Sequence, residues 1–321
     1  MTLRIAIFGA GRIGCWIAGP LAAQGHDVTL IGREPTGREI AEHGLTVLDA
    51  DEVIAATRNL RYDVGPESLA SADLVLVTTK SGGLAAAAAD ITRLARDDTV
   101  LVTLQNGIGV AAAFAPLVPR QKVLGGIVGF NVVHAGGGRW SKSSKGMIHC
   151  EKHPLLRDFG WHLVEDLRPI EWGKLLLNLN NPINALSGQP LKQQLEQIGY
   201  RRILATAMDE ALAVAKGAGV RPAKLGPTAP ALLSAGLRAP DWLFNPVLLP
   251  RQKISDTARL SMSDDYDTGK PTEIAELNGK VVVLGRQFGI ETPVNAALVK
   301  LIEAGGGNHF DARTMLRLVG L

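Results

Sequence analysis

The sequence contains little cysteine and no long apolar run, and each scarcity excludes a class of protein. Two cysteines, Cys15 and Cys150, occur among 321 residues, too few for a disulfide framework or a cysteine-rich metal site. We therefore expect no bound metal and a cytoplasmic protein, because that compartment keeps thiols reduced. The apolar segment that opens at Ile5 leaves too little room for a signal peptide ahead of it. Gly, Asn or Lys interrupt the apolar stretches well before the roughly 20 residues that span a bilayer, so no membrane partner is expected.

The chain also lacks a strong excess of charge of either sign. Its formal net charge is +3, which suits an anionic small molecule but falls short of the concentrated basic surface that nucleic acid requires. Hydrophobic residues make up 46% and charged residues 20%, as in soluble globular proteins. A chain of this length can bury a large core and can form two domains. We expect a small-molecule partner and no nucleic acid.

What the sequence does have is a glycine pattern, G-A-G-R-I-G, directly after the apolar run IAIF. A buried strand, a glycine turn and a helix form the first unit of a dinucleotide-binding fold. Gly9 would permit the tight turn, Gly11 would let the backbone approach a pyrophosphate, and Gly14 would let the helix pack on the strand. The helix N-terminus offers free amides to the phosphates. The candidate cofactor-binding residues of this turn are Gly9, Ala10, Gly11, Arg12, Ile13 and Gly14.

Strands alternate with helices through the first half of the chain. Apolar runs predict strands that end at Gly32–Arg33, at residue 80 and at Asn106–Gly107, with an alanine-rich helix from Leu84. A further strand is predicted over residues 122–133, and a hairpin over 138–151 with residues 142–146 at its turn. This alternation predicts an α/β fold with a Rossmann-type, doubly wound parallel sheet.

From Trp172 onward the periodicity is helical, with no intervening strand pattern. The segment that starts at Trp172 is predicted to be helical, and Pro182 is expected to kink or end this helix just after Asn181. Prolines and glycines between 222 and 250 predict loops inside a helical domain. We therefore expect an NADP-binding domain over residues 1–168 and an all-α substrate and catalytic domain over 169–321.

The end of the second strand predicts which dinucleotide binds. An acidic residue there binds the ribose 2′-hydroxyl of NAD, whereas an arginine accommodates the 2′-phosphate of NADP. In this sequence Gly32 takes the place of the acid, and Arg33 follows it. A guanidinium can hold a phosphate through two parallel hydrogen bonds. We expect NADP(H) as the cofactor; the alternative is that Arg33 is an exposed loop residue.

Two more strand ends carry polar side chains. Lys80 ends the strand LVLVTTK, and Asn106 ends LVTLQNG. Ligands of such sheets lie beyond the carboxyl ends of the strands, so both residues are candidates for cofactor or substrate contact. Ordinary loop and turn chemistry is the alternative for each.

In the helical half, Lys174, Asn178 and Asn181 recur at i, i+4 and i+7 in the segment WGKLLLNLNNPIN. On one helix they would share a face, with leucines on the other sides. A polar stripe on a buried helix is costly unless its groups are paired or meet a ligand. A lysine facing a nicotinamide could protonate the alkoxide that hydride transfer to a ketone leaves. The alternative is a solvated stripe with a capping asparagine.

Together these motifs resemble the ketopantoate reductase family (2-dehydropantoate 2-reductases). The resemblance covers nearly the whole chain and rests on GAGRIG, VTTK, LQNGIG, WGKLLLNLNNPINAL, and TEIAELNG followed by GRQFGIETPVN. It implies NADPH-dependent reduction of 2-dehydropantoate to (R)-pantoate in pantothenate biosynthesis. It also implies that Lys174 donates the proton, Asn178 and Asn181 bind substrate, Asn106 lies between cofactor and substrate, and Lys80 reaches the cofactor.

The resemblance assigns two late residues as well. It implies that Glu273, in PTEIAELNG, lies beside the active site and the cofactor, and that Ser261, in RLSMSDDYD, holds the substrate carboxylate. The alternatives are an ordinary helix start at Glu273 and a loop serine at Ser261. Glu210 matches a further acidic position of the family, but its helix is amphipathic and we interpret it as structural.

The sequence departs from the family at the second substrate asparagine. Many members have it eight residues after the lysine, where this chain has Pro182. Asn181 lies one residue short and is followed by proline, as the family's asparagine often is. A one-residue deletion would explain this, and Asn180 and Asn184 are rival candidates.

Three other functions compete with the ketopantoate reductase assignment. One is a paralogue that reduces a different branched or hydroxylated 2-oxo acid. Another is a non-catalytic NADP-sensing protein, which would not need Lys174, Ser261 and Glu273 together. A third is a β-hydroxy acid dehydrogenase, which shares the domain pairing and a catalytic lysine but not the late Ser and Glu. A homodimer is the candidate assembly.

Overall fold

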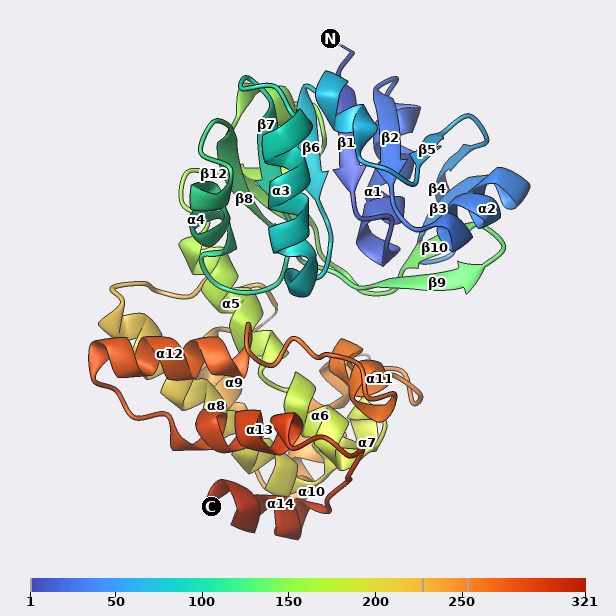
Figure 1. Cartoon of the computed structure of the whole chain (residues 1–321). Coiled ribbons are helices and arrows are strands. Elements are labelled where there is room, and N and C mark those ends of the chain that lie inside the picture. Colours follow the sequence, from blue (N-terminus) through green and yellow to red (C-terminus); the bar gives the residue numbers. More distant parts are fainter. Residues whose placement is uncertain (1, 227, 253) are drawn as a thin grey trace. The chain divides into compact units, whose positions relative to one another are not determined.

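The computed structural model describes residues 2–226, 228–252 and 254–321. The chain forms two compact units, Met1–Leu167 and Arg168–Leu321. Figure 1 shows strands gathered in the first unit and helices in the second. This arrangement confirms the expected fold class, an N-terminal Rossmann-type sheet followed by an all-α region.

The first unit is built on a mixed sheet with the order β12-β11-β8-β7-β6-β1-β2-β5. The run from β5 to β8 is parallel, and β11 joins β8 in the antiparallel sense. The order β5-β2-β1-β6-β7-β8 is that of dinucleotide-binding folds, with β1 at the centre. The strands are β1 (Arg4–Phe8), β2 (Asp27–Ile31), β5 (Arg61–Asp63), β6 (Leu74–Val77), β7 (Val100–Thr103), β8 (Lys122–Val128), β11 (Ile148–Glu151) and β12 (His162–Val164).

Helices cover both faces of this sheet because side chains alternate along each buried strand. Ile5 and Ile7 face the core that includes α1 (Arg12–Ala23). Ala6 faces the opposite core, with α3 (Leu84–Leu94) and Phe114 of α4 (Val110–Phe114). The predicted alanine-rich helix from Leu84 is thus confirmed. A further helix, α2 (Glu34–His43), follows β2.

A second sheet, which the sequence analysis did not predict, packs on α1 in the same unit. Its order is β4-β3-β10-β9, formed by β3 (Leu45–Asp49), β4 (Glu52–Thr57), β9 (Val132–Gly136) and β10 (Arg139–Lys142). Trp16 of α1 donates its indole N–H to the carbonyl of Leu48 at 2.9 Å. A Cβ at Gly19 would lie 2.5 Å from Val47, so glycine permits the close approach of helix and sheet.

Two predictions about residues 122–151 were wrong in detail. The strand predicted over 122–133 is divided into β8 and β9, which belong to different sheets. The hairpin turns at three glycines, Gly136, Gly137 and Gly138, whose φ angles are 76°, 59° and 71°, and not at residues 142–146. One long hairpin therefore contributes β9 and β10 to the small sheet and β8 and β11 to the large one. Residues 142–146 lie where one arm crosses between the sheets.

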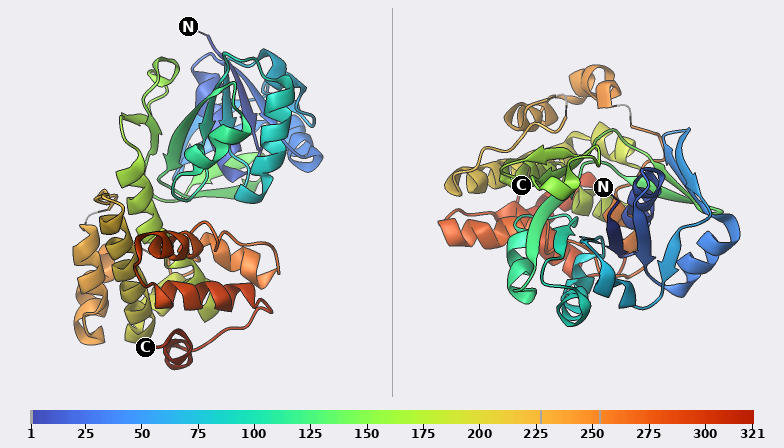
Figure 2. Two further views of the ribbon diagram at one scale, coloured as in Figure 1. Left: turned by 60° about the vertical axis from the view of Figure 1, so that its left-hand side comes forward. Right: turned by 90° about the horizontal axis from the view of Figure 1, so that it is seen from above.

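The second unit is all helical among its described residues, with α8, α12 and α13 packed together (Figures 1 and 2). Its helices are α5 (Arg168–Asn178), α6 (Asn181–Ser187), α7 (Leu191–Glu196), α8 (Ile198–Gly217), α9 (Pro230–Leu237), α10 (Asp241–Leu243), α11 (Ser261–Asp267), α12 (Asn278–Phe288), α13 (Pro293–Glu303) and α14 (Ala312–Val319). No described helix has both the length and the apolar character needed to cross a bilayer.

A buried arginine connects several of these helices. Arg201 of α8 is 0% exposed, and its guanidinium donates to the carbonyls of Leu195, Leu237 and Ala239 at 2.7–3.1 Å. It also pairs with Asp241 at 2.8 Å and stacks 4.1 Å from the Phe244 ring. The buried charge is therefore paired with a carboxylate and makes four hydrogen bonds, as a buried ion requires.

The segment between 222 and 250 also differs from its prediction. It contains α9 and α10 as well as loops, because Pro230 and Pro240 stand at helix starts, where a missing N–H costs nothing. Pro230 and Pro240, which we interpreted as loop residues, stand at helix starts.

Candidate active site

The glycine turn between β1 and α1 has the geometry that its spacing predicts. Gly9 has a φ of 122°, and a Cβ there would lie 2.7 Å from the backbone nitrogen of Thr79. At Gly14 a Cβ would lie 2.1 Å from the carbonyl oxygen of Gly9, so strand and helix could not pack. Gly11 differs, since a Cβ there would meet nothing within 4 Å. Packing does not require glycine at Gly11, so open space remains beside the backbone at the start of α1.

At the end of β2, packing excludes the acidic residue that would favour NAD. A Cβ at Gly32 would lie 2.4 Å from Ala10 and 2.5 Å from the Tyr62 hydroxyl. Tyr62 donates that hydroxyl to the carbonyl of Arg33 at 2.7 Å. Arg33 itself is exposed and precedes the first residue of α2. The guanidinium is thus carried on a backbone fixed by Tyr62.

Buried polar atoms gather beyond the carboxyl ends of β6 and β7. Gln105 donates to the carbonyls of Val77 and Thr79 at 2.8 and 3.0 Å, while its own Oε1 is buried with no partner among the described residues. The hydroxyls of Thr79 and Ser81 are in the same condition. Lys80 is exposed and Asn106 half-buried in the same two turns. The sequence analysis did not select Gln105; its place beside Asn106 at a strand end was the available signal.

In the helical unit, Lys174 and Glu273 influence each other electrostatically. Lys174 lies on α5, and Glu273 lies in the turns that precede α12. Burial lowers the pKa of the Lys174 ammonium below its ordinary value of 10.5, and the charge of Glu273 opposes part of that shift. Glu273 does not begin a helix, since α12 starts at Asn278. The interpretation of Glu273 as an ordinary helix start is therefore wrong.

The polar stripe of the sequence analysis does not lie on one continuous helix. α5 ends at Asn178 and α6 begins at Asn181, with Pro182 in its first turn, because proline cannot supply the next helical N–H. Leu177 is 45% exposed, so α5 is not buried on all sides. Lys174 and Asn178 are one turn apart on α5, while Asn181 starts the following helix.

The three candidate asparagines around this break have different environments. Asn180 and Gln194 exchange hydrogen bonds between their side-chain amides at 2.9 and 3.2 Å. Asn184 donates to the carbonyl of Gln189 at 3.0 Å and to Gln194 at 3.3 Å. Asn181 is 4% exposed, and the described residues offer its side chain no hydrogen-bond partner. Asn181 alone of the three is therefore buried without an internal partner in the described part of the chain.

Asn184 also fixes the segment that contains Ser261. Its Oδ1 accepts the backbone N–H of Leu260 and the Ser263 hydroxyl, both at 3.0 Å. These bonds hold α11 against α6. Ser261, the first residue of α11, is exposed, whereas Ser263 is fully buried. Ser263 is thus structural, and the Ser261 hydroxyl is accessible to solvent.

A network that the sequence analysis missed joins α8, α13 and α12. Glu210 accepts the backbone N–H groups of Val294 and Asn295 at 2.8 and 3.0 Å and the Asn295 amide at 2.7 Å. It therefore stabilises the start of α13, in agreement with its structural interpretation. Asn278 donates to Asn295 at 2.9 Å. Polar residues amid apolar ones, in ELNGKVVV and PVNAALV, were the available signal.

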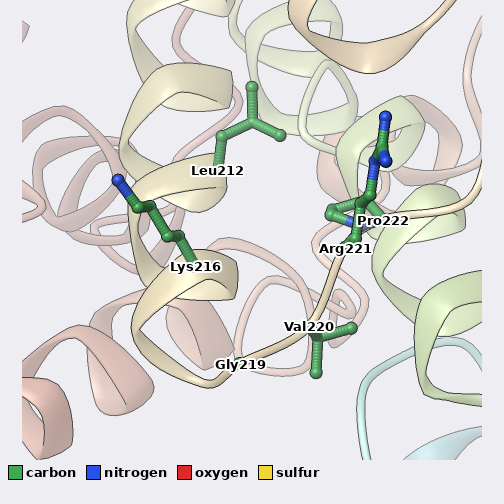
Figure 3. Close-up of a pocket in the computed structure, with 6 residues that line it drawn as sticks. All are labelled: Leu212, Lys216, Gly219, Val220, Arg221 and Pro222. Carbon is green, nitrogen blue, oxygen red and sulfur yellow. The ribbon is translucent and has the colours of Figure 1, made fainter.

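Other features of the described residues carry no comparable chemistry. An open hollow of about 390 Å³ lies beside the C-terminal end of α8, lined by Leu212, Lys216, Gly219, Val220, Arg221 and Pro222 (Figure 3). The Lys216 and Arg221 side chains extend away from each other, and none of the predicted site residues lines it. Cys15 and Cys150 are buried free thiols, and burial raises the pKa of each to about 12. They are packing residues. The described residues include no group of three or more His, Cys, Asp or Glu suited to a metal.

Comparison with known proteins places these features in a family. The model of ketopantoate reductase PanE/ApbA matches residues 5–154, and that of the ketopantoate reductase PanE/ApbA C terminal matches residues 166–305. A 2-dehydropantoate 2-reductase of Caulobacter vibrioides is 29% identical over 310 residues, covering 94% of this chain and 98% of the relative.

Solved structures show the same relationship. A PanE/ApbA family ketopantoate reductase from Ralstonia eutropha superposes with a TM-score of 0.79 at 26% identity, covering 94% of this chain and 97% of its own. D-mandelate dehydrogenase, solved with NADH and anilino(oxo)acetate, shares the fold with a TM-score of 0.74 at 22% identity and covers the same shares, 94% and 97%. The chain belongs to the ketopantoate reductase family, whose members are NAD(P)-dependent oxidoreductases.

Proposed function

We propose that this protein reduces 2-dehydropantoate to (R)-pantoate with NADPH, using Lys174 as the general acid. The observation that carries the proposal is Lys174, a half-buried side chain of α5 whose pKa is lowered by burial and raised in part by Glu273. A buried lysine with a lowered pKa and a specific charged neighbour is typical of a group that moves protons. Family membership supports the choice of substrate class, and the environments of the side chains in the helical unit support the role proposed for each residue.

The features of the first unit fit a dinucleotide-binding site. NADPH, when bound, supplies the hydride. The open space at Gly11 suits a pyrophosphate, and Gly9, Ala10, Arg12, Ile13 and Gly14 complete the turn. The unpartnered oxygens of Thr79, Ser81 and Gln105 are acceptors that a ligand's amide or hydroxyl groups could satisfy. We assign Lys80, Asn106 and Glu273 to the cofactor as well.

The choice of NADPH over NADH rests on the end of β2. Gly32 has no room for a side chain, so no carboxylate can stand there to bind a free 2′-hydroxyl or repel a phosphate. The exposed guanidinium of Arg33 follows at once. D-mandelate dehydrogenase, which shares the fold, was solved with NADH, so we infer the preference for NADPH from the end of β2 and not from the fold.

Lys174 acts on the carbonyl oxygen of the substrate. As the carbonyl becomes an alkoxide, the ammonium gives it one proton and becomes a neutral amine, which is then reprotonated from solvent. Because burial disfavours the ammonium, proton donation is easier than from an exposed lysine. The charge of Glu273 raises the pKa of Lys174 and so favours its acid form.

The remaining polar groups define the substrate. We assign the binding of the substrate's carboxylate to Ser261, because its hydroxyl is accessible to solvent. We assign the binding of a further polar group of the substrate to Asn178 and Asn181. A substrate with no such group would leave the Asn181 amide unpaired, at roughly 1–3 kcal/mol. 2-Dehydropantoate carries a 4-hydroxyl that can pair with it. Asn106 is assigned to the substrate also.

A substrate comparison tests the proposal. We expect kcat/KM for 2-dehydropantoate, followed by NADPH oxidation, to exceed that for 2-oxoisovalerate by at least about 10-fold, the value of one buried hydrogen bond. Asn178→Ala should narrow that gap, mainly by slowing the hydroxylated substrate. Equal kcat/KM values for the two substrates would favour the second candidate function, reduction of another 2-oxo acid by a paralogue. We consider this candidate because D-mandelate dehydrogenase shares the fold.

A further inference from the structure

The segment that contains Glu273 leads directly into α12. The backbone N–H of Leu277 donates to the carbonyl of Glu273 at 3.2 Å, and that of Gly279 donates to Ile274 at 2.9 Å. The helix begins at the next residue after Leu277, which is Asn278. The place of the Glu273 carboxylate therefore depends on where the first turn of α12 is held.

A chain of buried amides holds that first turn. Asn278 donates its side-chain N–H to Asn295 Oδ1 at 2.9 Å, and Asn295 donates to Glu210 Oε2 at 2.7 Å. Asn295 also donates to the carbonyl of Ala207 at 3.0 Å. Both asparagines are 0% exposed. The first residue of α12 is thus connected, through the start of α13, to two adjacent turns of α8.

Packing alone does not explain an asparagine at this position. Leu277 and Val281, on either side of it, are 0% exposed and already bury α12 against its neighbours. The Oδ1 of Asn278 is buried with no partner among the described residues. Burying this amide therefore costs more folding free energy than burying an aliphatic side chain would. The amide makes a directional contact. Its hydrogen bond fixes one position for the start of α12, whereas apolar packing alone would allow several positions.

We propose that Asn278 is a positioning residue for the reaction: through Asn295 and Glu210 it holds the Glu273 turn at the place where its carboxylate acts on Lys174. The proposal rests on the proposed function, in which Lys174 is the general acid. Asn278 touches no reacting group; it acts through Glu273.

The carboxylates near Lys174 determine what a shift of the Glu273 turn would do to the pKa of Lys174. Glu273 is the described charged group whose effect on Lys174 is resolved. Glu171, one turn earlier on α5, is buried as well, and Glu210 on α8 is engaged by the start of α13. The attraction between two charges falls with their separation. If the Glu273 turn shifts away, Lys174 loses the charge that raises its pKa, and its acid form disappears at a lower pH.

The test uses Asn278→Leu in the full-length protein, which keeps the branching and the number of side-chain heavy atoms and removes the donor. We expect kcat to fall about 10-fold, the KM for NADPH to change less than twofold, and the alkaline decline of kcat to move to lower pH. Asn278→Ala should do the same. The matched control is Ser234→Ala, because Ser234 is 2% exposed and bonds Ala205 and Asp209 of α8 without connection to α12. It should lower the melting temperature and leave the pH profile in place.

Combination with Glu273→Gln shows the route of the effect. If Asn278 acts through Glu273, Glu273→Gln alone should move the profile as far as the double variant Asn278→Leu/Glu273→Gln. The proposal would be overturned if the shifts in the pH profile of kcat caused by Asn278→Leu and by Glu273→Gln added in the double variant. It would also be overturned if Asn278→Leu had the pH profile of the wild type. Lys174→Ala separates the two levels: full activity there removes the proposed function, whereas an inactive Lys174→Ala with an unshifted Asn278→Leu removes the positioning role alone.

Discussion

At the scale of single residues, the burial of Lys174 opposes its own charge. Burial lowers the pKa of this ammonium below 10.5, and Glu273 raises it again in part. A general acid must be protonated, so activity is present below the pKa and declines as pH rises through it. We expect the alkaline decline of kcat to be centred below pH 10.5, and Glu273→Gln to move it lower still. A profile unchanged by Glu273→Gln would contradict the electrostatic pairing.

Removal of the lysine tests its role directly. Lys174→Ala should lower kcat by about two to four orders of magnitude, the usual effect of losing a general acid. NADPH affinity, measured by fluorescence titration, should change little. Lys216→Ala is the control, because Lys216 is an exposed lysine on α8. Equal activity of the two alanine variants would return Lys174 to the solvated-stripe interpretation.

Arg33 is the residue that we expect to distinguish the cofactors. Arg33→Ala should weaken NADPH binding by about 10- to 100-fold, which corresponds to about 1.5–3 kcal/mol for a charged contact to phosphate, and should leave NADH binding nearly unchanged. Arg38→Ala offers the comparison, since Arg38 lies on α2, the helix that Arg33 precedes, and pairs with Glu34 at 3.6 Å. If Arg33→Ala leaves the preference between the two cofactors as it was, another group recognises the phosphate.

At the scale of elements, two glycines of the β1–α1 turn should respond oppositely to the same added methyl group. In Gly14→Ala the new Cβ would lie 2.1 Å from the Gly9 carbonyl, so the backbone must shift, at about 1–3 kcal/mol or more. In Gly11→Ala it meets nothing within 4 Å, and the φ of −88° suits alanine. We expect Gly14→Ala to lower the melting temperature, and Gly11→Ala to keep it while weakening NADPH binding at least about 10-fold. Unweakened binding in Gly11→Ala would place the pyrophosphate elsewhere.

The α5–α6–α11 region allows a similar contrast between two asparagines. Asn184→Ala removes the bonds to Leu260 and Ser263 that hold α11 on α6 and should cost at least about 2 kcal/mol of unfolding free energy. Asn181→Ala removes a side chain with no partner among the described residues, so denaturation should show a change within about 0.5–1 kcal/mol. Its kcat/KM for 2-dehydropantoate should nevertheless fall. A large loss of stability in Asn181→Ala, with activity kept, would make Asn181 structural.

These contrasts show why part of the site could be predicted from sequence and part could not. The G-x-G-x-x-G turn is local, so its glycines have the geometry that their spacing predicts. The stripe from Lys174 to Asn181 was wrong as one helix because Pro182 removes an N–H that the next turn needs, and α6 begins at Asn181. The pairing of Asn180 with Gln194 depends on a contact fourteen residues away, which helical periodicity does not register.

The longer-range elements were harder for the same reason. The hairpin predicted over residues 138–151 was wrong, because β10 and β11 do not pair with each other and lie in different sheets. The hairpin that does form spans residues 122–151 and turns at Gly136–Gly138, where three glycines permit left-handed backbone. Its division between two sheets depends on β3 and α1, which are distant in sequence. The amides of Asn278 and Asn295 meet only once α12 and α13 pack on α8. Local patterns predicted the elements, and contacts between them determined the rest.

At the scale of the whole molecule, stability in acid should depend on one carboxylate at the amino end of the parallel sheet. Asp73 accepts the Arg4 backbone N–H at 3.0 Å and pairs with the guanidinium groups of Arg4 and Arg96 at 2.7 and 3.0 Å. These bonds connect β1 and β6 with the segment before β7, and they hold the pKa of Asp73 well below its ordinary value of 3.8.

A group with a depressed pKa stabilises the folded state above its unfolded pKa, and that contribution is lost as pH falls through the folded one. We therefore expect Asp73→Asn to lower the melting temperature at pH 7, and the deficit to shrink steadily below about pH 4, where the unfolded carboxyl begins to protonate. Asp98→Asn is the matched control, since Asp98 also pairs with Arg96 but is 77% exposed, and exposed pairs contribute little. Thermal unfolding of the three proteins from pH 7 to pH 3 measures the difference. A deficit in Asp73→Asn that stays constant over this range would mean that the carboxylate's hydrogen-bonding shape, and not its charge, joins these strands.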